Sequence, residues 1–342
     1  MTQHIAVIGA GAWGTALAKV LAGKGFAVRI WAYEAEVAEQ INATRENPVY
    51  LPGIVLPKGL TATPDLADAA TGASHLLVVC PSHVLRQTMR QVIGHVARDA
   101  ILINASKGIE ADSGKLISQI LEEVAPRHAA RTVFLSGPSF ATEVAQERPT
   151  AVVLAARDHA LATAVQQLFR TPWLMTFCHG DVIGVQVGGA MKNVIAIAAG
   201  IVDGLQLGDN TRAALLTRAL YEMMKVGRAL GGNPLTLVGL AGIGDLILTC
   251  TGDRSRNRAV GMALGQGKSV AEVTAGARTV AEGIATAKAV YQLIDRHRLM
   301  APICMAVYRI LYEAKPPITA LNELLTLDLK DELGAILPPA CG

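Results

Sequence analysis

A glycine-rich segment between two apolar strands constrains the fold of this chain more than any other part of its sequence. The strand-like run HIAVI (residues 4–8) passes directly into GAGAWG (residues 9–14), then into a helical pattern over 15–21 and a second strand-like run over 27–31. In this setting GxGxxG is typical of dinucleotide binding, because the glycines allow a tight turn and bring main-chain N–H groups to a pyrophosphate. The alternative is a glycine-rich turn of another doubly wound protein.

The rest of the first half alternates between strand-like and helical patterns. Such alternation predicts an α/β fold with a parallel, doubly wound sheet, and ligands in such sheets bind beyond the carboxyl ends of the strands. We expect a dinucleotide-binding domain over residues 1–180. The further strands are expected at 75–79, 100–104, 132–136, 150–155 and 173–177, and the helices at 34–42, 82–93, 115–124 and 159–169.

Several polar side chains follow the ends of these strands. Ser82, Lys107 and Ser139 each come just after a predicted strand, so they are placed to line the cleft, although Lys107 could equally be an exposed loop lysine. The second strand ends at Ala32-Tyr33-Glu34. An acidic residue there suits the ribose 2′-hydroxyl of NAD, whereas an arginine suits the 2′-phosphate of NADP. Glu34 favours NAD, but its register is uncertain by one residue and the choice stays open.

A lysine stands alone in a long apolar run. Between Asp181 and Asp203, only Lys192 carries a formal charge. Burying an unpaired ammonium costs several kcal/mol, so this lysine has a partner or takes part in chemistry. On a helix its neighbours include Gly188 and Gly189, whose bare backbone permits close approach by another backbone or a ligand. We interpret Lys192 as a proton-transferring group, with a lysine that reaches out of a core helix to solvent as the alternative.

The second half is predicted to be mostly helical and to hold an anion site. We expect this domain over residues 181–342, with Asp245 after the flexible run GLAGIG. The segment RSRNR (254–258) offers guanidinium, hydroxyl and amide donors at a helix start, which suits an anion, although an isolated basic turn of this kind is more often a solvated loop. Later helices are expected at 211–230, 257–265, 270–274, 282–296, 302–313 and 319–325.

Composition narrows the classes of partner. The net charge of +3 and the aromatic content of 4% disfavour nucleic acid. The apolar run around Lys192 contains polar residues and glycines, and the N-terminus enters a strand directly, so we expect no stable membrane insertion and a cytoplasmic protein. The cysteines and histidines lack paired spacing, so no disulfide framework and no metal are predicted. An apolar helical domain favours a homodimer only weakly.

Motifs in order along nearly the whole chain resemble the bacterial-type NAD(P)-dependent glycerol-3-phosphate dehydrogenases. The lysine segment and SRNR are the most specific of them. The matching pieces are GAGAWG (9–14), NPVYLPG (47–53), PSH (81–83), SKG (106–108), SGPSFA (136–141), GVQVGGAMKNVIAIAAG (184–200), GLAGIGDLILTC (239–250), SRNR (255–258) and VAEG (280–283).

This resemblance implies a fold and a reaction. The fold would be a Rossmann domain followed by an all-α domain like that of 6-phosphogluconate dehydrogenase. The reaction would interconvert sn-glycerol 3-phosphate and dihydroxyacetone phosphate with NAD or NADP, supplying the backbone of phospholipids. The partner would then be a small phosphorylated molecule.

The resemblance also implies site residues. Lys192 would be the proton acceptor and would also bind substrate. The cofactor would be held by Gly9, Gly11, Ala12, Trp13, Gly14, Tyr33, Lys107, Ala141, Arg256, Val280 and Glu282. The substrate would be held by Lys107, Gly137, Ser139, Asp245, Ser255, Arg256 and Asn257.

Two departures from the family are visible. Many relatives have Arg or His at the position of Tyr33, which puts an NADP preference in doubt, and some have Gly-Arg at Thr326-Leu327. Two rival functions remain: a lysine-using dehydrogenase of an unphosphorylated hydroxy acid, and a non-catalytic module that senses NAD(H). Burial and Lys107 would lower the pKa of Lys192, and a nearby Asp245 would raise it.

Overall fold

The computed structural model describes residues 4–275 and 281–327, which form two compact units. Unit 1 comprises residues 1–107 and 117–182, and unit 2 comprises 108–116 and 183–342. The segment 108–116 packs with the helical unit, because Ile109 and Leu116 are buried in its apolar core. The expected boundary after residue 180 did not anticipate this excursion of the chain.

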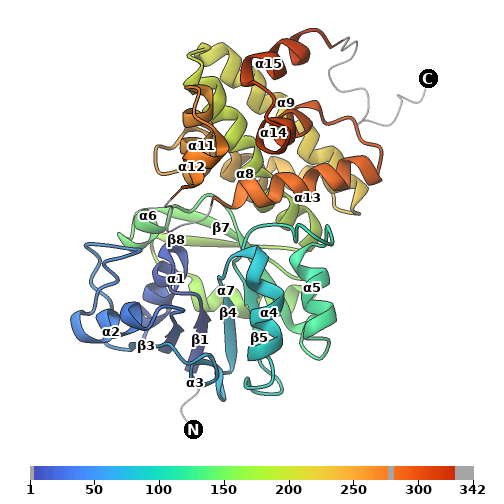
Figure 1. Cartoon of the computed structure of the whole chain (residues 1–342). Coiled ribbons are helices and arrows are strands. Elements are labelled where there is room, and N and C mark those ends of the chain that lie inside the picture. Colours follow the sequence, from blue (N-terminus) through green and yellow to red (C-terminus); the bar gives the residue numbers. More distant parts are fainter. Residues whose placement is uncertain (1–3, 276–280, 328–342) are drawn as a thin grey trace. The chain divides into compact units, whose positions relative to one another are not determined.

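Unit 1 is built on an eight-stranded sheet with the order β3-β2-β1-β4-β5-β6-β7-β8 (Figure 1). This is the Rossmann-like architecture predicted from the alternating pattern. The short strand β3 was missed, because LTAT carries little apolar signal. The strands are β1 (His4–Ile8), β2 (Ala27–Trp31), β3 (Leu60–Thr63), β4 (His75–Val78), β5 (Ile101–Asn104), β6 (Thr132–Ser136), β7 (Thr150–Ala155) and β8 (Leu174–His179).

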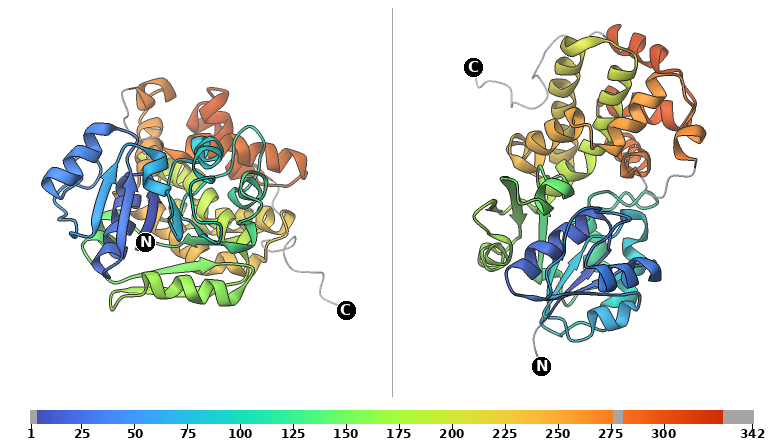
Figure 2. Two further views of the ribbon diagram at one scale, coloured as in Figure 1. Left: turned by 90° about the horizontal axis from the view of Figure 1, so that it is seen from below. Right: turned by 90° about the vertical axis from the view of Figure 1, so that its left-hand side faces the viewer.

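Helices cover both faces of this sheet (Figure 2). On one face α1 contacts both α6 and α7, and α4 contacts α5 on the other. Of these helices, α3 and α6 were not predicted, because each has only one turn. The helices of unit 1 are α1 (Ala12–Gly23), α2 (Ala35–Thr44), α3 (Leu66–Ala70), α4 (Ser82–Val92), α5 (Ile117–Val124), α6 (Ala141–Ala145) and α7 (His159–Phe169), with a 3-10 turn η1 (Ala129–Arg131).

One strand pairing differs from the fully parallel sheet that was expected. Strands β6 and β7 are antiparallel, with Phe134 opposite Ala155. A parallel crossover must carry the chain back along the length of the sheet. The connection from Ser136 to Thr150 contains only the five-residue helix α6 and returns at the same end. The prediction of parallel pairing was therefore wrong at this one place.

Unit 2 is helical and is organised around α8 (Val182–Gly204), the helix that carries Lys192. This helix is long and apolar enough to span a membrane, but 94% of its most apolar window is buried inside the protein, as in a core helix. The other elements are α9 (Gly208–Ala229), η2 (Pro234–Val238), η3 (Leu240–Gly244, a π-helical turn), α10 (Asp245–Thr251), α11 (Arg256–Gly265), α12 (Val270–Thr274), α13 (Glu282–Arg296), α14 (Pro302–Tyr312) and α15 (Pro317–Leu325).

Glycines allow helices of unit 2 to touch along their backbones. A Cβ atom at Gly200 of α8 would lie 2.0 Å from the carbonyl oxygen of Arg258, and one at Gly261 of α11 would lie 2.0 Å from that of Ile197. Only residues without a side chain fit at such a crossing. This contact holds the beginning of α11, with its SRNR sequence, against the second half of α8.

Candidate active site

The glycine-rich turn of unit 1 has the shape that a dinucleotide requires. Gly9 has φ +118°, and a Cβ there would lie 2.9 Å from the oxygen of Val79. A Cβ at Gly14 would lie 1.9 Å from the oxygen of Gly9, so this glycine lets α1 pack closely on the turn. A Cβ at Gly11 would meet open space instead. Gly11, the second glycine of GxGxxG, therefore leaves room for a ligand to approach the backbone.

The first turn of α1 offers donors to that space. No side chain caps the helix at Gly11, so the N–H groups of Ala12, Trp13 and Gly14 have the free ends expected of a helix start. The indole Nε1 of Trp13 is buried and has no hydrogen-bond partner within the described residues. A buried donor without a partner costs about 1–3 kcal/mol, which a ligand can offset. These residues fit a bound dinucleotide.

Predicted residues also meet at the ends of β5 and β6. The Lys107 Nζ donates to the carbonyl oxygen of Gly137 at 3.2 Å, and the Ser139 hydroxyl donates to the same oxygen at 3.0 Å. Gly137 itself has φ +131°, which only glycine adopts without strain. Ala141 begins α6 and is half-buried against the core of unit 1. The structure therefore brings Lys107, Gly137 and Ser139 together.

Tyr33 takes a different position. The residue is 82% exposed, and its ring stands edge-on to that of Trp31, with ring centroids 6.1 Å apart. The neighbouring Glu34 is held by Tyr50, whose hydroxyl donates to Oε1 at 2.7 Å. The acidic group at the end of β2 is therefore fixed in place by a residue that was not predicted as part of the site.

The centre of unit 2 is a buried lysine with polar partners. Lys192 is 8% exposed, and its Nζ donates to Asp245 Oδ1 at 2.5 Å and to Thr249 Oγ1 at 3.0 Å. Asp245, at 1% exposure, is the first residue of α10, and Thr249 follows one helical turn later. The Thr249 hydroxyl donates to the main-chain oxygen of Asp245 at 2.6 Å, so its lone pairs face the lysine.

Local backbone contacts explain why this lysine finds its partners. A Cβ atom at Gly188, one turn before Lys192, would lie 2.2 Å from the carbonyl oxygen of Ala241. Gly188 thus admits the π-helical turn η3 against α8, and α10 starts directly after that turn. The sequence left open whether a ligand or another backbone approaches the glycines beside Lys192. At Gly188 the neighbour is the backbone of Ala241.

The start of α11 lies beside the residue that follows Lys192. Asn257 donates from Nδ2 to Asn193 Oδ1 at 2.9 Å, and its Oδ1 accepts from the main-chain N–H of Gly283 at 2.9 Å. Gly283 follows Glu282, the first residue of α13. Asn257 is therefore joined to the residue after Lys192 and to the residue after Glu282, whereas Val280 lies outside the described residues.

Two arginines of RSRNR, Arg256 and Arg258, differ in their surroundings. Arg258 pairs with Asp203 at 2.7 Å and with Asp253 at 3.0 Å, so its charge is used within the fold. Ser255 caps α11 by accepting from the N–H of Arg258 at 3.2 Å. Arg256 is exposed at the first residue of the helix. That Arg256 binds a ligand anion stays a prediction.

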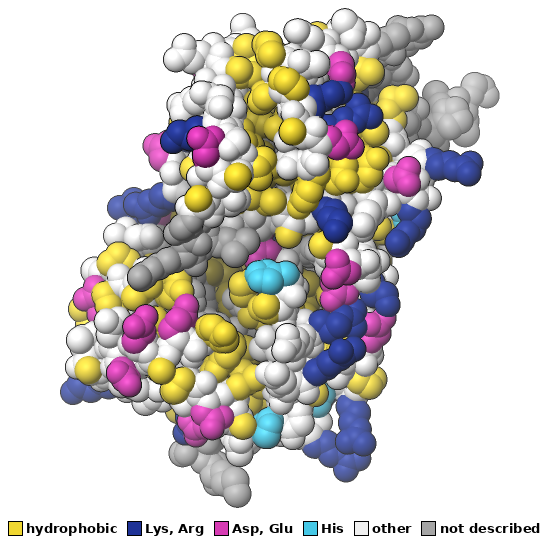
Figure 3. Space-filling model, viewed as in Figure 1, with side chains coloured by type: hydrophobic (Ala, Val, Ile, Leu, Met, Phe, Trp, Pro, Cys, Tyr) yellow, Lys and Arg dark blue, Asp and Glu magenta, His cyan; other side chains and the backbone are white. Residues whose placement is uncertain are grey.

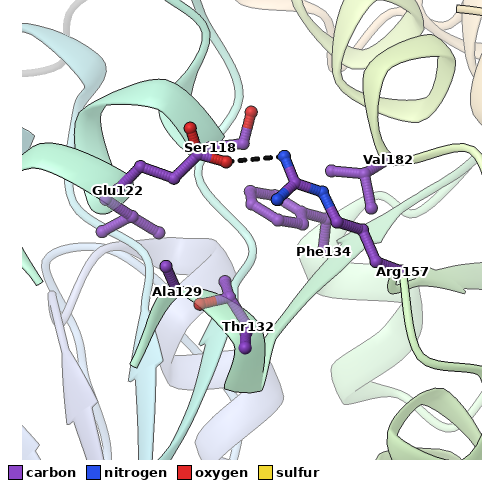
Figure 4. Close-up of a pocket in the computed structure, with 9 residues that line it drawn as sticks. Ser118, Glu122, Ala129, Thr132, Phe134, Arg157 and Val182 are labelled. Carbon is purple, nitrogen blue, oxygen red and sulfur yellow. Dashed lines mark hydrogen bonds and ion pairs between the residues drawn. The ribbon is translucent and has the colours of Figure 1, made fainter. Parts of the chain in front are cut away.

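Two further features, one in each unit, are not assigned to this chemistry. Burial raises the pKa of the Cys250 thiol to about 12, so this neighbour of Thr249 stays protonated and is not a nucleophile. A pocket in unit 1 near the ion pair of Glu122 and Arg157 (2.6 Å) has a volume of about 20 Å³, room for a single water (Figure 4).

Asn193 and Thr249 were missed as site residues. The signal for Asn193 was its position next to the lysine, and that for Thr249 was its place four residues after Asp245, on the same face of a helix. A side-chain hydroxyl at that spacing can reach the same ammonium as the carboxylate. This inference needs the helix start at Asp245, which the glycine-rich sequence before it did not predict.

Together, a Rossmann unit with an uncapped helix start and a helical unit with a buried lysine define a dinucleotide-dependent oxidoreductase. Family models described as the N-terminus and C-terminus of NAD-dependent glycerol-3-phosphate dehydrogenase match residues 4–162 and 181–322. The chain belongs to the NAD-dependent glycerol-3-phosphate dehydrogenase family.

Individual relatives cover nearly the whole chain. A protein of Geobacter sulfurreducens named glycerol-3-phosphate dehydrogenase [NAD(P)+] is 53% identical over 97% of this chain and 99% of its own length. The crystal structure of glycerol-3-phosphate dehydrogenase from Coxiella burnetii superposes with a TM-score of 0.90 at 37% identity, covering 96% of this chain and all of that one. The enzyme from Saccharomyces cerevisiae gives 0.77 at 30% identity, over 94% and 99%.

Proposed function

We propose that Lys192 is the proton donor and acceptor of this chain, acting in the interconversion of sn-glycerol 3-phosphate and dihydroxyacetone phosphate with NAD(P). The observation that carries the proposal is the buried Lys192 amine, held by Asp245 and Thr249. Relatives named glycerol-3-phosphate dehydrogenase [NAD(P)+] support the substrates, because their similarity to this chain extends over both units. A non-catalytic NAD(H) sensor would have no need of such a lysine.

Lys192 stabilises the charge that develops on the C2 oxygen of the substrate and transfers a proton to it. When bound, the reduced nicotinamide supplies the hydride and the oxidised form accepts it. As the carbonyl is reduced, negative charge grows on its oxygen, and the Lys192 ammonium stabilises this charge and donates a proton. In the reverse direction, the neutral amine removes the proton of the C2 hydroxyl. Asp245 and Thr249 hold the amine in one position, so little reorganisation is needed in the transition state.

The phosphate of the substrate is recognised by Arg256. An exposed guanidinium at a helix start combines two donors for an anion, its own N–H groups and the helix N-terminus. Ser255 and Asn257 support this arrangement, since the first caps α11 and the second joins it to Asn193. Binding through the phosphate places C2 for reaction, which is how remote groups contribute to rate.

In unit 1, the cofactor phosphates are bound by Gly9, Gly11, Ala12, Trp13 and Gly14. Tyr33 and Ala141 complete the cofactor contacts, and Lys107, Gly137 and Ser139 contribute at the ends of β5 and β6. The support for these roles is the open space at Gly11, the unpaired indole of Trp13 and the shared carbonyl of Gly137. Val280, Glu282 and Arg256 are proposed as cofactor contacts from the second half of the chain.

An optical assay tests the reaction. The purified full-length protein is mixed with NADH or NADPH, and the loss of reduced nicotinamide is followed after addition of dihydroxyacetone phosphate. Oxidation of the reduced nicotinamide is expected with dihydroxyacetone phosphate and not with dihydroxyacetone alone, because the proposed contact of Arg256 is with the phosphate group. Equal rates with an unphosphorylated 2-oxo acid would favour the rival dehydrogenase. Tight NADH binding without oxidation would favour the sensing module.

We propose that this reaction takes place in the cytoplasm and supplies phospholipid synthesis. sn-Glycerol 3-phosphate has the three-carbon phosphorylated backbone that acylation requires. The described cysteines Cys80, Cys178, Cys250 and Cys304 are free thiols, as suits a reducing compartment.

A homodimer is proposed through a face of unit 2 formed by α9, α14 and α15. Helices α9, α14 and α15 enclose an apolar cavity of about 220 Å³, and its lining includes Met300 at 66% exposure and Leu325 at 74%. Figure 3 shows hydrophobic side chains gathered on the helical unit. Exposed apolar surfaces of this kind mark association sites. Light scattering of the wild type and of Leu325→Glu tests this, with a dimer and a monomer as the expected results. A monomeric wild type would contradict it.

A further inference from the structure

We infer that Tyr50 positions Glu34 to bind the adenosine ribose and so makes NAD(H) the preferred cofactor of this chain. The inference rests on the proposed function, because it concerns the cofactor of the same site. Its evidence is a continuous series of hydrogen bonds in unit 1, from the glycine-rich turn through Asn47 and Tyr50 to Glu34.

Glu34 lies where the ribose of a dinucleotide is recognised. The second strand, β2, ends at Trp31, whose carbonyl oxygen accepts from the N–H of Gly9, the first glycine of the turn. Three residues later, Glu34 occupies the position before α2, but its side chain makes no capping hydrogen bond to that helix. The carboxylate is directed instead to Tyr50, whose hydroxyl donates to Oε1 at 2.7 Å.

Tyr50 is held in turn by a fully buried asparagine. Asn47, at 0% exposure, donates from Nδ2 to the carbonyl oxygen of Ala10 (2.8 Å) and to Thr15 Oγ1 (2.9 Å). Its Oδ1 accepts from the N–H of Tyr50 at 3.1 Å, and its carbonyl accepts from the N–H of Leu51 at 2.8 Å. The turn that presents Tyr50 is thereby fastened to the same loop that receives the pyrophosphate.

This arrangement suits two ribose hydroxyls. An ionised carboxylate accepts at roughly four lone-pair positions, so one bond from Tyr50 leaves capacity for donors of the ribose. A carboxylate that is already oriented loses little freedom when it binds, and this preorganisation increases affinity. A 2′-phosphate at the same place would meet a fixed negative charge, which opposes binding of NADP(H).

Two nearby arginines, Arg29 and Arg45, are held by other partners and are not oriented as ligands for a 2′-phosphate. Arg29, on β2, donates from Nη1 to Asp68 Oδ1 at 2.9 Å. Arg45, at the end of α2, donates from Nε (3.0 Å) and Nη2 (2.9 Å) to the carbonyl oxygen of Leu56. Both guanidinium groups are engaged by partners within unit 1. The residue beside Glu34 is Tyr33, a neutral side chain, so the segment Ala32-Tyr33-Glu34 itself offers no cation to a 2′-phosphate.

Direct binding to the full-length protein without substrate tests the inference. Titrations with NADH and NADPH by nicotinamide fluorescence should show NADH bound about tenfold or more tightly. In Tyr50→Phe, the NADH affinity should fall about three- to tenfold, the range of one hydrogen bond, with little change for NADPH. Glu34→Gln should bring the two affinities within about threefold, because the amide keeps the shape and removes the charge.

The fragments 5′-AMP and 2′,5′-ADP extend the test, since they differ only at the ribose phosphate. The same order of preference is expected for them, and it should again decrease in Tyr50→Phe. A matched control is Tyr312→Phe, which removes a tyrosine hydroxyl bound to the oxygen of Ile284 in unit 2. Its ratio of NADH to NADPH affinities should equal that of the wild type.

The results separate this inference from the proposed function. Equal affinities of the wild type for NADH and NADPH would overturn the inference, even if dihydroxyacetone phosphate is reduced. A Tyr50→Phe variant that weakens both cofactors by the same factor would also overturn it, because a purely structural role predicts an unchanged ratio. Selective NADH binding without reduction would support the inference and contradict the function.

Discussion

Glu222 on α9 accepts a hydrogen bond at Oε1 from the main-chain N–H of Ile303, 2.7 Å away at the start of α14. Its second oxygen accepts from the N–H of Cys304 at 2.9 Å. A carboxyl group from one helix therefore caps another, and Glu222 is 3% exposed. Burial raises the pKa of Glu222 to about 7, against the opposing effect of these two N–H donors.

This capping predicts a pH-dependent stability. The folded-state pKa of about 7 lies above the ordinary value of 4.5, so the folded chain binds the proton more tightly. The resulting stabilisation is complete below pH 4.5 and is lost as the pH rises through 7. Its size is on the order of 3 kcal/mol. Urea unfolding should show that the wild type loses stability relative to Glu222→Gln as the pH rises from 4.5 to above 7. If the free energies of unfolding of the two proteins changed in parallel with pH, the assignment would be contradicted.

Removing the amine of Lys192 should abolish turnover and also weaken the fold. Lys192→Ala leaves Asp245 charged and buried, which costs about 3–5 kcal/mol. Lys192→Met with Asp245→Asn removes both charges, so we expect it to recover most of that stability while remaining inactive. Loss of turnover by about a hundredfold or more is expected in both. NADH binding should persist, and an active Lys192→Ala enzyme would refute the proton-transfer role.

Alanine substitutions of two arginines on α11 form a matched pair of variants. Arg256→Ala should raise the KM for dihydroxyacetone phosphate about ten- to a hundredfold, as expected for the loss of a charged phosphate contact. Arg258→Ala should leave KM nearly unchanged and instead lower the free energy of unfolding by about 1–3 kcal/mol, because it pairs with Asp203. Steady-state kinetics and urea unfolding distinguish them. The opposite pattern would move the phosphate site to Arg258.

The contact between α8 and α11 should not tolerate a methyl group. Gly261→Ala places a Cβ 2.0 Å from the oxygen of Ile197, so the helices must separate, at a cost of about 1–3 kcal/mol or more. Gly23→Ala in α1 meets no atom within 4 Å and should be neutral or stabilising by about 0.5 kcal/mol. Thermal unfolding measures both. Equal midpoints for the two variants would show that the crossing is adaptable.

Sequence reasoning reached the fold because its signals are local. The turn from Gly9 to Gly14 and the alternation that follows it appear within short windows, and the main elements of unit 1 were predicted from them. The burial of Lys192 was also predictable, since its apolar neighbours are adjacent in sequence. The antiparallel pairing of β6 with β7 was not, because the direction of a strand depends on where its connection returns.

The site was less accessible because its contacts are long-range. Asp245 is separated from Lys192 by 53 residues, and its approach depends on a π-helical turn that no simple periodicity signals. Nothing in the sequence distinguishes Arg258 from the other arginines of RSRNR. Its partner Asp203 lies 55 residues away, so their pairing has no local signal. Tyr50 gave no local sign that its hydroxyl reaches Glu34. The site roles of Ser255, Arg256 and Asn257 stay predictions that the variants above can test.

The excursion of residues 108–116 into unit 2 has a consequence for how the protein can be divided. Ile109 and Leu116 contribute apolar surface to the helical core, yet the chain on either side of this segment belongs to unit 1. A polypeptide beginning at residue 183 would lack both side chains and would present an uncovered hydrophobic depression to water. The two units are thus distinct as packed bodies but interleaved along the chain. A single cut after residue 182 leaves unit 1 whole but carrying 108–116, and it removes that segment from unit 2.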